Sequence, residues 1–300
     1  MKALIAIDGS PESTDALQTA VRVLNADGRE MDLFCVAPRF SRRSENRARS
    51  ERYKERALRE ITQILEQARS GLLPEAGVVR LVTAIGSPSG LIVKKASDYD
   101  VTVIGPKGRG STGGPGLGPV ASRVVEYASS PVLIARRLET GDGLRVLAAV
   151  DGSEASLRSV EMLGRLCDLT SAEVCLMHVA ETPWIELGPE EDWITYSEED
   201  KEHSETGELE KELVREGEAV IEEAREFLAP YRAAVTTRVV EGDPTNEILS
   251  EADRGEYDLV VVGATGIRDL KHRMLGSVST KLAWNAPCSV LIVSGPQPLD

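Results

Sequence analysis

The amino-acid sequence predicts an α/β protein made of two similar domains, each built around a parallel sheet. The first observation is that the chain of 300 residues carries the same ordered set of segments twice. The second is that apolar runs typical of buried strands alternate with helical patterns within each half, as they do in βαβ units. A chain of this length is also enough for two domains of ordinary size.

The internal repeat is visible in four pairs of similar segments. In order along the chain, residues 4–10 resemble 147–153, 86–88 resemble 242–244, 99–105 resemble 257–263, and 132–134 resemble 290–292. The same order in both halves indicates a tandem duplication. A short polar segment that contains glycine, Glu139 to Gly143, separates the copies. We therefore predict one domain over residues 1–138 and a second over residues 144–295.

The second half shows the expected order of elements most clearly. Short apolar runs predict buried strands at residues 144–150, 174–179, 236–240, 259–262 and 290–293. Ser153 is expected to cap the first helix, as Ser10 does before Pro11, because a serine hydroxyl accepts a hydrogen bond from the first turn. Amphipathic or proline-led patterns predict further helices at residues 210–228, 244–252 and 278–284.

The most informative motif follows the strand predicted at residues 259–262. Gly263 and Gly266 stand where this strand ends, and nine residues later Gly276 and Ser277 stand where a helix begins. A backbone without Cβ atoms lets a ligand approach closely, and a helix N-terminus offers unpaired N–H groups and the positive end of its dipole. The spacing G-x2-G-x9-G-S therefore predicts a phosphate-binding site.

This motif resembles the nucleotide-binding signature of the universal stress protein family, in its ATP-binding branch. The resemblance extends over nearly the whole chain, twice. It implies two tandem doubly wound domains of the adenine nucleotide alpha hydrolase-like kind, each with a five-stranded parallel sheet flanked by helices. It also implies a regulatory, stress-response module that binds ATP, with Mg²⁺ accompanying the nucleotide. Ligands of doubly wound sheets bind at the carboxyl ends of the strands, where Asp151 and Gly263 stand.

The resemblance assigns the main ATP site to the second half. Asp151 would accept hydrogen bonds from the ribose hydroxyls, or it is a turn aspartate that caps a helix start. Val179 ends a strand where the family presents backbone groups to adenine, or it is a core valine. Arg273 belongs to a cationic loop that would offset phosphate charge, although exposed loops commonly carry such charges. Ser279 would reach a phosphate or face solvent. The expected ATP-binding residues are Asp151, Val179, Val262, Gly263, Gly266, Arg273, Gly276, Ser277, Val278 and Ser279.

The first half carries an altered copy of the motif. Its sequence runs from Gly105 to Gly108 and, nine residues later, to Gly118 and Pro119. Pro119 stands where the second half has Ser277, and it has neither an N–H nor a hydroxyl to donate to a phosphate. Proline is also favoured at the first position of a helix. A weaker ATP site is therefore expected at Asp8, Val36, Ile104, Gly105, Gly108 and Gly118.

The sequence indicates no catalytic set and no metal site made by the protein alone. No Walker lysine follows the glycines and no paired acid and base are evident, so we expect at most slow ATP hydrolysis. The four cysteines lack metal-ligand spacing and are expected to be small buried hydrophobes. His178 is expected to be nearly buried and hydrogen-bonded.

Charge and hydropathy bear on partners and location. A net charge of −14 argues against general nucleic-acid binding, which requires neutralisation of phosphates. The sequence enters a strand by Ala3 without a signal-peptide pattern, and no apolar run reaches the roughly 20 residues of a membrane span. We therefore expect a cytoplasmic protein. Nine basic and three acidic residues lie at 39–59, and thirteen acidic and two basic at 181–212. They are either solvated surface segments or a means of association between chains as a homo-oligomer.

The last strand of each half is expected to join the two domains. Residues 132–135 and 290–293 are short, apolar and placed at predicted sheet edges. An exposed apolar edge strand is a liability unless it is paired or covered. The family resemblance implies that these strands pair antiparallel, so that the duplicated chain forms an internal pseudo-dimer.

Two other classes of function remain open. The first is a nucleotide-free interaction protein that acts through its dimer surface, which Pro119 favours for the first half and Gly276-Ser277 disfavours for the second. The second is an enzyme of the wider adenine-binding α/β group, such as an adenylyl transferase or a PP-loop ATPase. Those enzymes need a HIGH-type or an SGGxDS-type motif, and neither occurs in the chain.

Overall fold

The computed structural model describes residues 1–39, 47–72, 77–111, 114, 116–138, 143–181, 205–266 and 275–294. The strands form one ten-stranded sheet in the order β3-β2-β1-β4-β5-β10-β9-β6-β7-β8. The strands are β1 (Lys2–Ala6), β2 (Glu30–Pro38), β3 (Val78–Gly86), β4 (Val101–Ile104), β5 (Val132–Ile134), β6 (Arg145–Ala149), β7 (Glu173–Ala180), β8 (Ala234–Glu241), β9 (Leu259–Gly263) and β10 (Ser289–Val293). Within each half the strands are parallel, which confirms the predicted α/β architecture.

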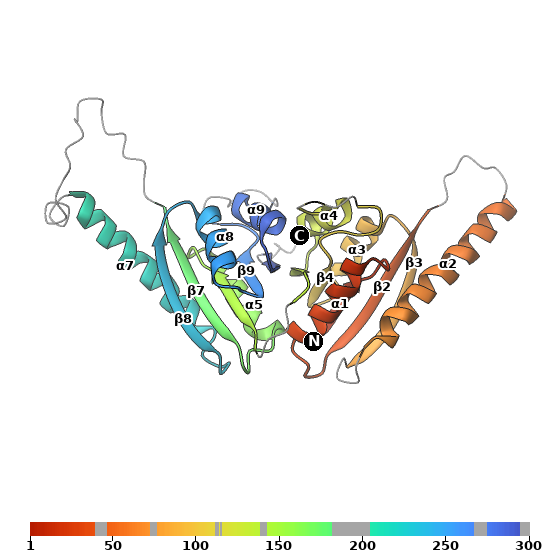
Figure 1. Cartoon of the computed structure of the whole chain (residues 1–300), viewed down its shortest axis with the longest axis horizontal. Helices are drawn as coiled ribbons and strands as arrows, with labels where there is room; N and C mark the ends of the chain where they lie inside the picture. The colour runs from red at the N-terminus through yellow and green to blue at the C-terminus, as the bar shows by residue number, and fades with distance from the viewer. Residues whose placement is uncertain are drawn as a thin grey trace, which may run out of the picture.

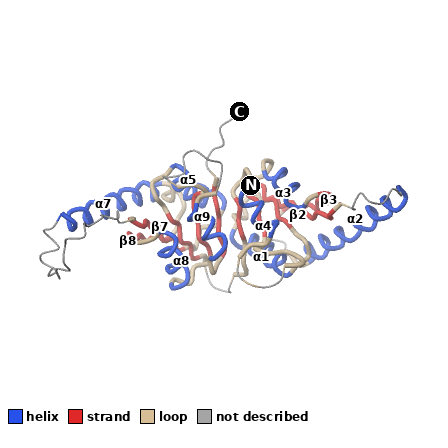
Figure 2. Tube along the Cα trace, turned by 90° about the horizontal axis from the view of Figure 1, so that it is seen from above, coloured by secondary structure: helices blue, strands red, loops and turns tan. Residues whose placement is uncertain are grey.

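Helices cover both faces of this sheet. They are α1 (Pro11–Val23), α2 (Arg47–Ser70), α3 (Pro88–Ala96), α4 (Pro119–Tyr127), α5 (Glu154–Leu166), α7 (Glu205–Glu226), α8 (Pro244–Arg254) and α9 (Ser277–Asn285). Apolar residues of α1, α2, α5 and α7 form one buried layer, and those of α3, α4, α8 and α9 form the other. The two halves lie side by side, with α2 and α7 at opposite ends of the molecule (Figures 1 and 2).

The helix starts follow the signals in the sequence. Ser10 and Ser153 cap α1 and α5, and each hydroxyl accepts a hydrogen bond of 3.2 Å from the backbone N–H three residues later. Proline occupies the first turn of four helices: α1, α3, α4 and α8. A proline is tolerated there because the first N–H groups of a helix have no partner within the helix. Both predicted serine caps are confirmed.

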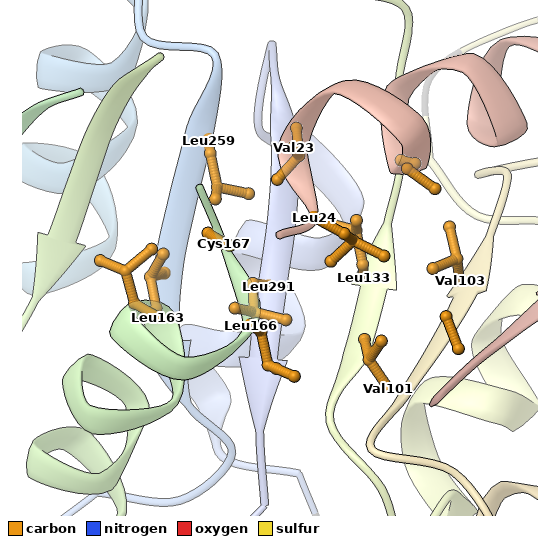
Figure 3. Packing of buried hydrophobic residues seen from close by; sticks show 14 of the residues in the cluster. Val23, Leu24, Val101, Val103, Leu133, Leu163, Leu166, Cys167, Leu259 and Leu291 are labelled. Atoms are coloured by element: carbon orange, nitrogen blue, oxygen red, sulfur yellow. The ribbon is translucent and has the colours of Figure 1, made fainter. Parts of the chain in front are cut away.

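The two halves are joined by their last strands. β5 and β10 pair antiparallel, with Leu133 opposite Leu291. Both leucines are only 1% exposed, because helices cover the junction. A second contact pairs the ends of α1 and α5, where Leu24 and Cys167 form an antiparallel bridge. Figure 3 shows these side chains packed around the junction. The predicted pairing of the last strands as an internal pseudo-dimer is therefore confirmed.

Several smaller expectations are also tested by the structure. Cys35, Cys167 and Cys175 are buried as predicted, whereas Cys288 is half-buried. Within the described residues, no helix has both the length and the apolar character that crossing a membrane requires. The two charged segments lie partly outside the described residues, so association of whole chains through them stays a prediction.

Candidate nucleotide-binding site

The predicted site of the second half lies at the carboxyl edge of the sheet. β6 pairs in parallel with β9 on one side and β7 on the other, so their carboxyl ends meet at one edge. Asp151 follows β6, Val179 lies near the end of β7, and Gly263 ends β9. The chain runs outward from β6 to β8 on one side and returns through β9 on the other, so the site lies at a topological switch point.

Two glycines of the motif allow close packing in this edge. A Cβ on Gly263 would lie 2.7 Å from the carbonyl carbon of Ala155, in the first turn of α5. A Cβ on Gly266 would lie 2.7 Å from Oδ2 of Asp151. The loop after β9 therefore rests directly on the Asp151 carboxylate, which brings these predicted site residues together.

The start of α9 places the N–H groups of a first helical turn beside this loop. Gly276 caps the helix, and its N–H donates to the carbonyl oxygen of Ala264 at 2.7 Å. The N–H groups of the following first turn, from Ser277 onward, have no acceptor within a helix. Ser277 is exposed and Val278 is half-buried. Gly276 has φ of −61°, a value open to any residue, so its backbone conformation does not require a glycine.

Of the two expectations for the Ser279 side chain, exposure to solvent is wrong: the residue is 4% exposed, and Oγ donates to the carbonyl oxygen of Gly263 at 2.8 Å. Ser279 thus ties α9 to the end of β9, and its contact with a phosphate stays a prediction. The Val262 side chain is buried in the core and Val179 is half-buried. Arg273 lies outside the described residues.

Asp151 and its counterpart Asp8 are both used as turn aspartates. Oδ1 of Asp151 accepts from the Ser153 hydroxyl at 2.6 Å and from its N–H at 3.0 Å. Oδ1 of Asp8 accepts from the Ser10 hydroxyl at 2.6 Å, and its Oδ2 accepts from the Arg109 N–H at 2.7 Å. The capping role is therefore present in both halves, and any ribose contact would be additional to it.

The six residues predicted for the weaker site surround one cavity in the first half. This cavity has a volume of about 620 Å³, which suits a small organic ligand. Its lining is mostly apolar, with Phe34, Ile61 and Ile92 among the walls. The predicted residues that line it are Asp8, Val36, Ile104, Gly105, Gly108 and Gly118. The structure thus brings all of them together.

Sequence reasoning missed the cations of this cavity. Arg56 from α2 and both Lys107 and Arg109 from the loop after β4 line it. The Arg109 guanidinium lies against Gly9 and is 3.7 Å from the carboxylate of Glu60 on α2. The only signal in the sequence was the position of Lys107 and Arg109 beside the motif glycines, within a segment that is rich in glycine throughout.

Acid titration of Asp8 gives a first testable consequence. Burial raises the pKa of this carboxyl, but hydrogen bonds from the Ser10 hydroxyl and the Arg109 N–H outweigh it, so the pKa lies below the ordinary 3.8. A depressed pKa means that the ionised carboxylate stabilises the fold above the unfolded value, and this contribution is lost as pH falls through the folded pKa. We expect Asp8→Asn to flatten the acid limb of the unfolding free energy. Urea unfolding between about pH 2 and 6 measures it, and an unchanged acid limb would contradict the assignment.

His178 makes a hydrogen bond to the backbone. Its Nδ1 lies 2.9 Å from the carbonyl oxygen of Val150 and must carry the proton of that hydrogen bond. The predicted hydrogen bond is therefore confirmed. The residue is half-buried, which is less burial than expected. In the part of the chain that the structure describes, no group of three metal-ligating side chains comes together.

A doubly wound five-stranded unit, present twice and joined through its last strands, defines the architectural class of this chain. The universal stress protein family profile matches residues 1–136 and again residues 144–294. The chain therefore belongs to the universal stress protein family.

Known relatives agree with this assignment. Universal stress protein YxiE of Bacillus subtilis is 33% identical over 149 residues, which cover 50% of this chain and 97% of YxiE. Universal stress protein Rv1996 of Mycobacterium tuberculosis is 26% identical over 318 residues, covering 98% of this chain and 95% of Rv1996. Among solved structures, a universal stress protein from Archaeoglobus fulgidus has a TM-score of 0.61 at 18% identity, covering 99% of this chain and 97% of that one. The last two matches each span nearly the whole of both chains.

Proposed function

We propose that this chain is a regulatory universal stress protein that binds ATP, and that its C-terminal half is the tighter ATP site. The observation that carries the proposal is the start of α9. The N–H of Gly276 is bonded to the carbonyl oxygen of Ala264, whereas the N–H groups of Ser277 and the next residues have no acceptor within α9, and we assign these donors to phosphate. Open N–H groups at a helix start attract phosphate through hydrogen bonds and through the helix dipole.

The surrounding residues suit the rest of a nucleotide. Gly276 is buried, but its φ of −61° does not require a glycine, and we attribute the missing Cβ to space for a ligand. Asp151 lies under the loop and would add a ribose contact to its capping role, and Val179 would offer backbone groups to adenine. Arg273 would offset phosphate charge. Mg²⁺ would be held mainly by the phosphates, since magnesium sites commonly combine one or two carboxylates with substrate phosphates.

The chain's own residues point to binding and not to turnover. No paired acid and base was evident in the sequence, and occupancy of the site would act by ordering the glycine loop and changing the surface that the protein presents. At most slow hydrolysis of ATP would accompany this. The alternative of a nucleotide-free protein acting through its dimer surface has less support, because β5 and β10 already bury that surface within one chain.

The first half is the weaker site because α4 starts differently. Pro119 occupies the first turn of α4, and the N–H of Gly118 is bonded to the carbonyl oxygen of Pro106 at 2.8 Å. The first N–H group that α4 can offer to a ligand is therefore one residue further along the helix than in α9. Lys107 and Arg109 place positive charge in the same cavity, but long side chains lose rotamer freedom when they bind.

Exchanging the two helix starts tests this ranking. Ser277→Pro is expected to weaken ATP binding at the C-terminal site by about ten- to hundredfold, because each lost hydrogen bond to a charged phosphate costs roughly 1.5–3 kcal/mol. The helix should persist, since α4 already begins with proline. Calorimetric titration of the full chain with ATP and Mg²⁺ measures both sites.

Pro119→Ser is the matched reciprocal variant, and it should tighten the N-terminal site without weakening the other. Equal ATP affinities of the two sites in the wild type would refute the ranking. So would a Ser277→Pro variant whose tighter site binds ATP with unchanged affinity.

A further inference from the structure

The glycine loop of the first half ends against a helix of the second half. This loop runs from Gly105 to Gly118, between β4 and α4. At Gly116, with φ of +97°, a Cβ would lie 2.5 Å from Cε3 and 2.8 Å from Cζ3 of Trp284, near the end of α9. The next residue, Leu117, is buried in the layer that also contains Leu282 of α9. The indole of Trp284 thus supports the end of a loop that lines the N-terminal cavity.

An arginine of the first half holds the same end of α9. Arg136 follows β5, and its guanidinium donates to the carbonyl oxygens of Ala283 and Cys288, both at 2.9 Å. Its backbone N–H donates to Oγ of Ser289 at 3.1 Å, and its own carbonyl oxygen accepts from the Thr19 hydroxyl at 2.7 Å. Carbonyls at a helix C-terminus are unpaired within the helix, so a guanidinium is a suitable partner.

This arrangement is not symmetric between the halves. By the repeat, Ser294 corresponds to Arg136, and Glu126 corresponds to Trp284. A serine hydroxyl is too short to bridge two carbonyls in the way a guanidinium does. The first half therefore contacts α9 through Arg136 and Trp284, and neither residue is repeated in the other half.

The two ends of α9 therefore belong to different sites: one to the proposed ATP site and the other to the contact with the first half. Its N-terminus carries the open donors of the proposed ATP site, and its C-terminus carries Trp284 and the carbonyl held by Arg136. Between them, Ser279 ties the helix to the end of β9. A nine-residue helix is about 13 Å long and moves as one body. A shift at Trp284 would therefore tilt the donors at Ser277 about the Ser279 attachment.

We propose that α9 couples the two ligand sites, so that a ligand in the N-terminal cavity changes the ATP affinity of the C-terminal site. The inference rests on the proposed function, because it assumes phosphate at the start of α9. Lys107, Gly108 and Gly118 line the cavity, so its ligand touches the loop that rests on Trp284. Arg136 and Trp284 are positioning residues for the C-terminal site. Coupling of this kind is reciprocal, and typical coupling changes affinity by about 5- to 150-fold.

A double-mutant cycle in the full chain tests the coupling. Gly108→Val blocks the N-terminal site, because its Cβ would meet the Asp8 carboxylate. The ATP affinity of the C-terminal site is then measured by calorimetry for wild type, Gly108→Val, Trp284→Ala and the double variant. We expect Gly108→Val to shift this affinity by about fivefold or more when Trp284 is present, and by less than about twofold when it is alanine.

Phe227→Ala is the control for loss of a partly exposed aromatic residue, since Phe227 is 37% and Trp284 is 42% exposed. The Gly108→Val shift should persist in the Phe227→Ala background. An equal shift with and without Trp284, or no shift at all, would overturn the coupling while leaving ATP binding intact. Failure of the wild type to bind ATP at the C-terminal site would instead refute the proposed function.

Tryptophan fluorescence provides a second measurement that does not need Gly108→Val to fold. The chain has three tryptophans, so replacing Trp184 and Trp193 with phenylalanine leaves Trp284 as the single reporter. Ser277→Pro is added to weaken the C-terminal site. ATP is then titrated to concentrations at which calorimetry shows the N-terminal cavity to be filled. A change in Trp284 emission that follows this filling is expected, and unchanged emission would contradict the proposal.

Discussion

Gly276→Val is expected to abolish ATP binding at the C-terminal site and to leave the chain folded. The residue has φ of −61° and ψ of 160°, a conformation that valine adopts readily. Its N–H bond to Ala264 does not involve the side chain. The new methyl groups would occupy the space through which a phosphate reaches the donors of α9. Loss of two such hydrogen bonds corresponds to an affinity decrease of about a hundredfold or more.

Binding and folding must be measured on the same variant. Calorimetry with ATP and Mg²⁺ gives the affinity, and circular dichroism with thermal melting gives the fold. Gly118→Val is the matched control, because Gly118 caps α4 with φ of −74°. It should lower the ATP affinity of the N-terminal site directly. The affinity of the C-terminal site should change less, through the coupling alone. A folded Gly276→Val variant with unchanged ATP affinity would mean that phosphate does not bind at α9.

Leu291→Lys should cause the largest loss of stability. Leu291 lies opposite Leu133 in the β5–β10 pair and is 1% exposed, so the ammonium group would be buried without a described acidic partner. An uncompensated buried charge costs about 3–5 kcal/mol. Because this pair is the sheet connection between the halves, we expect a lower melting temperature and the separation of one cooperative transition into two. Differential scanning calorimetry measures both effects.

Tyr127→Lys provides the control for this experiment. Tyr127 is 56% exposed on α4, so the same new charge stays in water and should change stability little. Two independent transitions in the wild type that Leu291→Lys leaves unaltered would contradict the view that the halves unfold as one unit. The same substitution at Leu133 should reproduce the result from the other side of the junction.

Local signals explain why the fold was predictable. The serine caps at Ser10 and Ser153 and the prolines that begin helices act within one turn, so the sequence alone places those helix starts. The apolar edge strands required a partner or a cover, and the family resemblance implied that they pair with each other. The start of α7 was less predictable: it lies at Glu205, before the residue 210 that its amphipathic pattern indicated.

Side-chain direction and contacts between the halves were not predictable. The burial of Ser279 depends on how α9 is rotated against β9, which sequence spacing does not determine. The approach of Gly116 to Trp284 depends on the placement of one half against the other. Lys107 and Arg109 were overlooked because a glycine-rich loop has no periodic pattern from which a cavity wall can be inferred. Long-range packing therefore decides the features on which the coupling depends.

Mass spectrometry of the small molecules released from freshly purified, denatured protein tests the central claim most directly. The wild-type chain is predicted to release an adenine nucleotide, ATP foremost, and the Gly276→Val chain, purified in parallel, is predicted to release much less. Release of no nucleotide by a wild-type chain that also fails to bind added ATP, or equal release by both chains, would contradict ATP binding at the start of α9.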